Sequence, residues 1–324
     1  MGNVRTGQVI KLDYRKAAVM LMSGFIALLF FKNSEAASRF VSRGIEVSVT
    51  RLIPSLFPFL VVSSLLLSSG LGRVIGKTAG KPLCALLGIS GEGACAVLLG
   101  FICGFPVGAK CAYSLLGEGK IEKRECERLL AICSIPSPAF VIDVIGEDVL
   151  GSRSDGVCLW LICGASALCV GIFLRLVSPL PTTPTTDSTV CVARKNFSTI
   201  FTSSVREGAE SMLYVCAFVI FFSAFLGALD AVISPFSLPR TARALLFGLF
   251  ELTSGSLEIS ALEEGSRFAI CALTAGWSGL SVHFQTMAIC SGERPSFKPF
   301  ILSHAARAVI GYLVALLLRG LLFF

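Results

Sequence analysis

The stretch that decides the fold is CGFPVGAKCAYSLLGEGKIEKRECERLL, residues 103–130. It places Pro106 between Gly104 and Gly108 in apolar sequence, followed by Lys110 and then by a dense run of charges. Proline and glycine interrupt helices, so a helix is predicted to break here and to leave backbone N–H and C=O groups without helical partners. A break of this kind in apolar sequence requires surroundings that satisfy those groups.

The composition identifies those surroundings as a membrane. Hydrophobic residues make up 54% of the 324 residues, charged residues make up 15%, and the mean hydropathy is +0.79. Soluble domains contain about 45–50% apolar and about 25% charged residues. We therefore expect an all-α polytopic membrane protein.

Seven segments approach the roughly 20 apolar residues that a bilayer requires. They lie at 17–31, 52–70, 129–146, 156–177, 209–229, 268–290 and 300–318. Two further apolar stretches, 93–116 and 241–262, carry Gly, Pro or polar residues at their midpoints, which is typical of re-entrant hairpins. The segment 17–31 is interpreted as an uncleaved helix, with a cleaved signal peptide as the alternative because NSEAAS follows it at 33–38.

The basic residues orient the protein. With the N-terminus inside, the predicted inner segments hold 17 Lys and Arg and the outer segments hold 9, which favours a cytoplasmic N-terminus. The net charge of +7 does not indicate nucleic-acid binding, because the basic residues lie in short loops between apolar spans.

A segment rich in Pro, Thr and Ser divides the chain. It begins as SPLPTTPTTDSTV at 178–190, and the predicted linker 178–208 separates a first repeat, 1–177, from a second, 209–324. In each half an interrupted hairpin precedes an interrupted helix, and the predicted topology inserts the two hairpins from opposite faces. Inverted repeats of this kind indicate a transporter site at the bilayer midplane, whereas glycines that only permit close helix packing are the alternative.

Polar and conformationally special residues at these interruptions are the candidate substrate-binding residues. Broken backbone, helix N-termini and Lys110 could attract an anion, although Lys110 could instead reach the membrane surface as an anchor. In the first half the candidates are Gly104, Phe105, Pro106, Gly108, Lys110, Ser134, Ser137 and Pro138.

In the second half Glu251 is a candidate for binding a coupling proton or Na⁺, because ionisable groups at membrane depth are usually functional. A salt bridge from Glu251 to Arg243 or Arg307 is the alternative. His283 and Gln285 could bind a solute or make interhelical contacts. The full set of candidates is Glu251, Thr253, Ser254, Gly255, Ser278, Gly279, His283 and Gln285.

Enzymatic and metal chemistry are not expected. The 13 cysteines include no C-x-x-C pair and are interpreted as small residues of membrane helices. His283 and His304, which are the 2 histidines of the chain, lie in no recognisable nucleophile or metal motif. No cofactor is predicted beyond a coupling proton or Na⁺.

Several motifs resemble the sporulation integral membrane protein YlbJ family, whose members carry nucleoside-recognition (Gate) domains. They are LIPSLFPFLVVSSLLLSSGL (52–71), GFPVGAK (104–110), EGKIEKRECERLLAICSIPSPAFVIDVIG (118–146), GLFELTSG (248–255) and GWSGLSVHFQ (276–285). The resemblance implies a fold similar to concentrative nucleoside transporters and the movement of dipicolinic acid across a forespore membrane. The chain departs from the family pattern at Cys133-Ser134 and at Ser137-Pro138.

We therefore expect a membrane transporter of a small anion such as dipicolinate, with the lipid bilayer as partner and no nucleic acid. A nucleoside or other small-solute transporter and a non-transporting sporulation scaffold are the alternatives. Self-association into a homo-oligomer is left open.

The inverted topology can be tested by labelling. Single cysteines that replace Gly117 and Glu263 in a cysteine-free chain should react with an impermeant maleimide from opposite faces of the membrane, inside and outside respectively. Reaction of both from one face would contradict the inversion.

Overall fold

The computed structural model describes residues 14–69, 78, 80–180, 196–290 and 295–322. Within them the chain is helical and contains no β-strand. The helices of the first half are α1 (Tyr14–Lys32), α2 (Ser34–Val47), the π-helical η1 (Ser48–Leu52), α3 (Ile53–Ser68), α5 (Lys81–Leu87), α6 (Gly91–Cys103), α7 (Val107–Gly117), α8 (Lys123–Cys133), the π-helical η2 (Phe140–Val149) and α9 (Arg153–Val177). Those of the second half are α10 (Phe197–Ile233), the short 3₁₀ helix η3 (Ser234–Phe236), α11 (Arg240–Phe250), α12 (Leu252–Ile259), α13 (Glu264–Trp277), α14 (Gly279–Ile289) and α15 (Lys298–Leu322).

The helices are those of a polytopic membrane protein. Four described helices are long and apolar enough to cross a bilayer, namely Ser34–Leu66, Arg153–Val177, Phe197–Phe236 and Lys298–Gly320. The pair α5 and α6, bent by 100°, raises the number to five if it counts as one span. Large apolar side chains cover the outside, including Phe31, Leu213 and Leu317. An apolar exterior on this scale suits lipid rather than water.

Two predicted boundaries differ from the structure. The span expected at 52–70 begins earlier, at Ser34, because the amphipathic sequence of α2 continues into η1 and α3 without a break. The linker expected at 178–208 is helical from Phe197 onward. Hydropathy alone overlooks a helix whose outer face is polar. Predicted loop residues at 1–13, 70–77, 181–195 and 291–294 lie outside the described residues.

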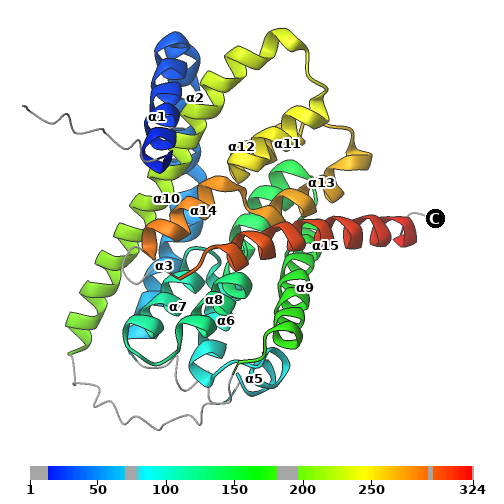
Figure 1. Cartoon of the computed structure of the whole chain (residues 1–324). Coiled ribbons are helices and arrows are strands. Elements are labelled where there is room, and N and C mark those ends of the chain that lie inside the picture. Colours follow the sequence, from blue (N-terminus) through cyan, green and yellow to red (C-terminus); the bar gives the residue numbers. More distant parts are fainter. Residues whose placement is uncertain (1–13, 70–77, 79, 181–195, 291–294, 323–324) are drawn as a thin grey trace, which may run out of the picture.

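The long helix formed by α2, η1 and α3 lies antiparallel to α10 along one side of the molecule (Figure 1). The two approach through glycines. A Cβ atom on Gly44 would lie 2.9 Å from Ser223 Oγ, and one on Gly208 would lie 2.7 Å from Val61 Cγ2. Small residues at such crossings bring helix backbones together, which favours helix association in a membrane.

The structure places two packed helices at each predicted hairpin. α6 and α7 contact through Gly100 and Gly108, since a Cβ atom on Gly108 would lie 2.8 Å from Gly100 Cα. α11 and α12 contact in the same way, through Gly248 and Gly255. The turns are shorter than expected. The first spans Gly104–Pro106 and the second is Glu251 alone, so Gly108 and Thr253–Gly255 lie in the first turns of α7 and α12.

Both predicted interrupted helices are broken. The first is α8, a non-helical segment at 134–137, and then the helical turn that leads into η2. Pro136 and Pro138 account for this break, because proline lacks an N–H group and restricts the residue before it to extended conformations. The second consists of α13 and α14, which meet at Ser278 and Gly279 with φ of 71° and 82°. A left-handed conformation at two successive residues ends a right-handed helix.

The glycine contact within the first hairpin predicts a mutational asymmetry. A methyl group at Gly108 would lie 2.5 Å from the carbonyl oxygen of Cys133, whereas one at Gly117 in the same helix would meet nothing within 4 Å. Gly108→Ala should lower the free energy of unfolding by about 1–3 kcal/mol and reduce the apparent melting temperature in detergent. Gly117→Ala is the matched control and should leave that temperature unchanged, so equal effects would contradict the packing.

Candidate functional site

The break in each interrupted helix lies against the turn of the hairpin in its own half. In the first half the N–H of Phe105 donates to the carbonyl of Ile135 at 2.8 Å. Gly104 has φ of 74°, and a Cβ atom there would lie 2.4 Å from the nitrogen of Ser137. Only glycine combines this conformation with so close an approach.

The second half repeats this arrangement. A Cβ atom on Gly279 would lie 3.0 Å from the nitrogen of Leu252 and 3.2 Å from Glu251 Cα. The indole Nε1 of Trp277 donates to the carbonyl of Leu249 at 2.9 Å. The turn of the second hairpin is therefore held against the break between α13 and α14.

The two halves meet at a small cavity, which we call the central cavity. Its volume is about 30 Å³, close to the share of liquid volume of one water molecule. Its lining combines both hairpin turns, both interrupted helices, the long helix containing η1 and α3, and α10. The lining residues are Leu52, Leu56, Phe105, Ser137, Phe140, Val215, Val219, Glu251, Leu252, Thr253, Val282 and Gln285.

Glu251 is the one charged side chain among the described residues that line the central cavity. It is 2% exposed, and its two carboxylate oxygens accept hydrogen bonds from the N–H groups of Thr253 at 2.8 Å and Ser254 at 2.6 Å. These bonds cap the N-terminus of α12, where negative charge is stabilised. Glu251 therefore has neither of the salt bridges considered from the sequence.

Gln285, Ser137 and Thr253 are the other polar candidates that line the central cavity. The Gln285 side chain donates to Ser281 Oγ at 3.3 Å, and its Oε1 has no hydrogen-bond partner among the described residues. Ser137 Oγ accepts from the N–H of Phe140 at 3.2 Å. An unpaired buried acceptor is costly, so Gln285 is suited to receive a hydrogen bond from a ligand or from water.

Five candidates lie at or beside the helix breaks, or within a hairpin, rather than in the cavity lining. Ser134 is fully buried in the first break, and the hydroxyl of Ser278 donates to the carbonyl of Ala275 at 3.0 Å. The ring of His283 packs edge-on against Trp277, with centroids 4.4 Å apart, and against His304 at 4.9 Å. Pro138 begins the helical turn that follows the first break, and Gly255 packs on Gly248.

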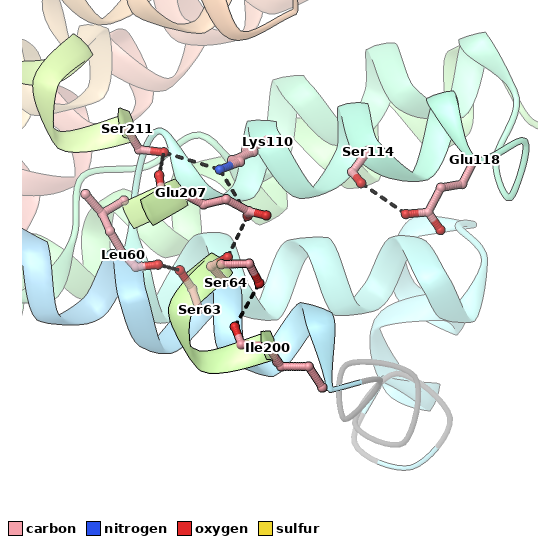
Figure 2. A network of polar contacts seen from close by, with 10 residues as sticks. Leu60, Ser63, Ser64, Lys110, Ser114, Glu118, Ile200, Glu207 and Ser211 are labelled. Atoms are coloured by element: carbon pink, nitrogen blue, oxygen red, sulfur yellow. Dashed lines mark hydrogen bonds and ion pairs between the residues drawn. The ribbon is translucent and has the colours of Figure 1, made fainter. Parts of the chain in front are cut away.

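Lys110 lies beside the central cavity, one turn into α7, together with Pro106 at a separate small cavity. Its ammonium is 3.4 Å from the carboxylate of Glu207 and 3.4 Å from the hydroxyl of Ser211, both on α10 (Figure 2). The hydroxyl of Ser64 on α3 donates to the same carboxylate at 2.6 Å. Lys110 thus connects the first hairpin to α10 and, through Glu207, to α3.

Arg307 of α15 links the interrupted helices of the two halves. It is 1% exposed, and its guanidinium donates to the carbonyls of Ser134 at 2.7 Å, Ala131 at 3.4 Å and Gly276 at 3.5 Å. These carbonyls lie at the C-terminal ends of α8 and α13, which carry partial negative charge and lack helical partners. One cation therefore neutralises both ends.

Arg307 and Glu207 were not predicted as site residues. Arg307 is the one charged residue within the predicted span 300–318. A charge inside a membrane span indicates a functional or structural role, but the sequence analysis considers Arg307 only as a partner of Glu251. Glu207 lies in the predicted linker 178–208, where a carboxylate indicates solvent exposure and not a site. Metal binding has no support in the part of the chain that the structure describes, which contains no group of three His, Cys, Asp or Glu side chains able to hold an ion.

The fold and the site together define a multi-pass helical membrane protein with interrupted helices at its centre. The chain is similar to the sporulation integral membrane protein YlbJ of Bacillus subtilis (strain 168), with 24% identity over 343 residues that cover 95% of this chain and 84% of that protein. This match confirms the resemblance to the YlbJ family. No family model and no solved structure matches the chain, and nucleoside recognition stays a prediction.

The role of Arg307 predicts a specific loss. Arg307→Gln should lower the free energy of unfolding by about 3 kcal/mol or more, because hydrogen bonds to a charged group contribute about 1.5–3 kcal/mol each. Arg307→Lys should not restore stability, since one ammonium cannot reproduce the planar fork that reaches two helices. The measurement is the apparent melting temperature in detergent, with Arg206→Gln on the exposed face of α10 as control. A stable Arg307→Lys protein would refute the bridging role.

Proposed function

We propose that this protein transports a small polar solute, and that the solute crosses at the central cavity. The observation that carries the proposal is the convergence of two hairpin turns and two helix breaks on one site. Irregular backbone at membrane depth is tolerated where it lines a cavity, and paired interruptions mark the substrate sites of transporters. The shared order of hairpin, interrupted helix and long helix supports inverted repeats like those of concentrative nucleoside transporters.

The charges around the central cavity support an anionic solute accompanied by a cation. The N-termini of α7 and α12 lie at the two hairpin turns, and the N-terminus of α14 lies at the second helix break. All three carry partial positive charge. Arg307 neutralises the C-terminal ends of α8 and α13. Glu251, however, adds a full negative charge to the lining. An anion and a carboxylate can share this site if a proton or Na⁺ arrives with the solute.

The proposed solute is dipicolinate, moved during spore formation. The support is the resemblance to the YlbJ family and the similarity to a protein named for sporulation. The same resemblance supports a location in the cell or forespore membrane, and the excess of Lys and Arg in the predicted inner segments supports a cytoplasmic N-terminus.

A neutral solute with hydroxyl groups, such as a nucleoside, is a second candidate. It is favoured by the two acceptors at the central cavity, Glu251 and the unpaired Gln285 Oε1. Uptake into proteoliposomes, measured for dipicolinate, nucleosides and simple carboxylates, separates the two candidates. Absence of uptake for every solute would favour a scaffold role.

Neutralising Glu251 should abolish most of the uptake. In Glu251→Gln one of the two oxygens becomes an amide group that cannot accept a hydrogen bond from Thr253 or Ser254, and no carboxylate remains to bind the coupling cation. We expect membrane insertion to be normal and uptake to fall by about tenfold or more, as for the loss of about 1.4 kcal/mol or more. Glu263→Gln, at an exposed carboxylate, is the matched control. Normal uptake by the Glu251→Gln protein would assign Glu251 to helix capping alone.

A further inference from the structure

Three small cavities follow one another along the contact between α10 and the long helix of α2, η1 and α3. The central cavity is the middle one. The second, which we call the hairpin-2 cavity, has a volume of about 20 Å³. It is lined by four residues of α2 between positions 40 and 47, by Val219 and Ser223 of α10, and by Glu251 and Glu258 of the second hairpin. The third, the hairpin-1 cavity, also of about 20 Å³, is lined by Leu60–Ser64 residues of α3, by Glu207 and Ser211, and by Pro106 and Lys110.

The three cavities lie in a single row. Along α10 their lining residues step from Ser223 and Val219, through Val219 and Val215, to Ser211 and Glu207, which is about one helical turn at each step. The central and hairpin-2 cavities share Val219 and Glu251. Each cavity measures only about 20–30 Å³, so a path along the row is constricted in this conformation.

An ion pair stands at each end of the row. At the hairpin-1 cavity, Lys110 of α7 pairs with Glu207 of α10 at 3.4 Å (Figure 2). At the other end, Arg243 of α11 pairs with Asp230 of α10 and, at 2.8 Å, with Glu258 of α12. Glu258 lines the hairpin-2 cavity, and the Arg243 guanidinium lies over Phe247, which lines it too.

The two ion pairs have the same arrangement of charges. In each, the hairpin supplies the cation, Lys110 or Arg243, and α10 supplies the carboxylate, Glu207 or Asp230. The two carboxylates lie about 35 Å apart along α10 at 1.5 Å per residue, close to the roughly 30 Å thickness of a bilayer's hydrocarbon core. The pairs therefore connect the two hairpins to one helix at two points separated by about the thickness of a membrane.

We propose that these two ion pairs are the gates of a single path through the central cavity, and that a small carboxylate-bearing solute opens them by exchange. At each face, the solute's carboxylate takes the place of the α10 carboxylate on the hairpin's lysine or arginine and releases the hairpin from α10. Both pairs are partly exposed, with side-chain exposures of 36% and 44% for Lys110 and Glu207 and 29% and 20% for Arg243 and Asp230. Neither pair is fully buried, so water and solute can reach both, and pairs that water screens are weaker than buried ones. This inference rests on the transport function proposed above and assigns Lys110 to a gate instead of the central site.

The test measures access to the central cavity from each face. Ser137→Cys, in a chain whose 13 native cysteines are replaced, provides the reporter, and an impermeant maleimide is applied to oriented vesicles without solute. Lys110→Glu replaces attraction to Glu207 by repulsion and should speed labelling from the face that carries residue 117. The expected increase is about fivefold or more, which exceeds the largest usual effect of an exposed ion pair. Arg243→Glu should do the same from the opposite face only.

Two controls keep the outcome specific. Glu35→Gln breaks an exposed ion pair with Arg39 on α2 and should leave both labelling rates unchanged. The double variant Lys110→Glu with Glu207→Lys restores an attractive pair and should restore slow labelling, which a misfolded protein would not do. Three outcomes would overturn the gates. Labelling could be unchanged in both single variants, it could become faster from the same face in both, or the charge exchange could fail to restore slow labelling.

The same reporter separates this inference from the proposed solute. In the same cysteine-replaced chain without the charge variants, dipicolinate should speed labelling of Ser137→Cys, while the neutral analogue pyridine-2,6-dicarboxamide should not. Face-specific labelling by the variants without any uptake of dipicolinate would support the gates and reject dipicolinate as the solute. Equal effects of the two compounds would reject opening by carboxylate exchange.

Discussion

The contact on which the centre of this protein depends is the one between Arg307 and three backbone carbonyls. Two helices, α8 and α13, end in the interior, and each end brings unsatisfied carbonyls and partial negative charge. A buried guanidinium that donates to Ala131, Ser134 and Gly276 offsets both. The desolvation of this charge is costly, so the cation and the helix ends are stable in the interior only together.

Glycine sets the distances within this arrangement. Gly100 with Gly108, and Gly248 with Gly255, let the two helices of each hairpin touch through their backbones. Gly104 and Gly279 let the backbone at the hairpin turn approach the backbone at the helix break. Both hairpins are thin as a result, and their turns reach the same cavity as α10 and the helix containing η1 and α3.

Much of this order could be predicted from the sequence because its cause is local. Pro136, Pro138 and Gly279 disfavour a continuous helix at their own positions, and apolar runs indicate membrane helices. The amphipathic helix α2 escaped prediction, because its polar face lowers its hydropathy. The partners of Lys110 and Arg307 could not be predicted either, since each pairing joins segments that only the folded chain brings together.

The position of Arg307 in the chain also bears on how the protein is made. α15 follows every other described helix in chain order, so the ribosome delivers both hairpins and both interrupted helices before the guanidinium that neutralises α8 and α13. Until α15 inserts, the newly made helices carry uncompensated carbonyls at membrane depth, which are costly there. Assembly of the centre is therefore a late event of biogenesis. Before α15 inserts, water or a membrane chaperone must supply hydrogen-bond donors to those carbonyls.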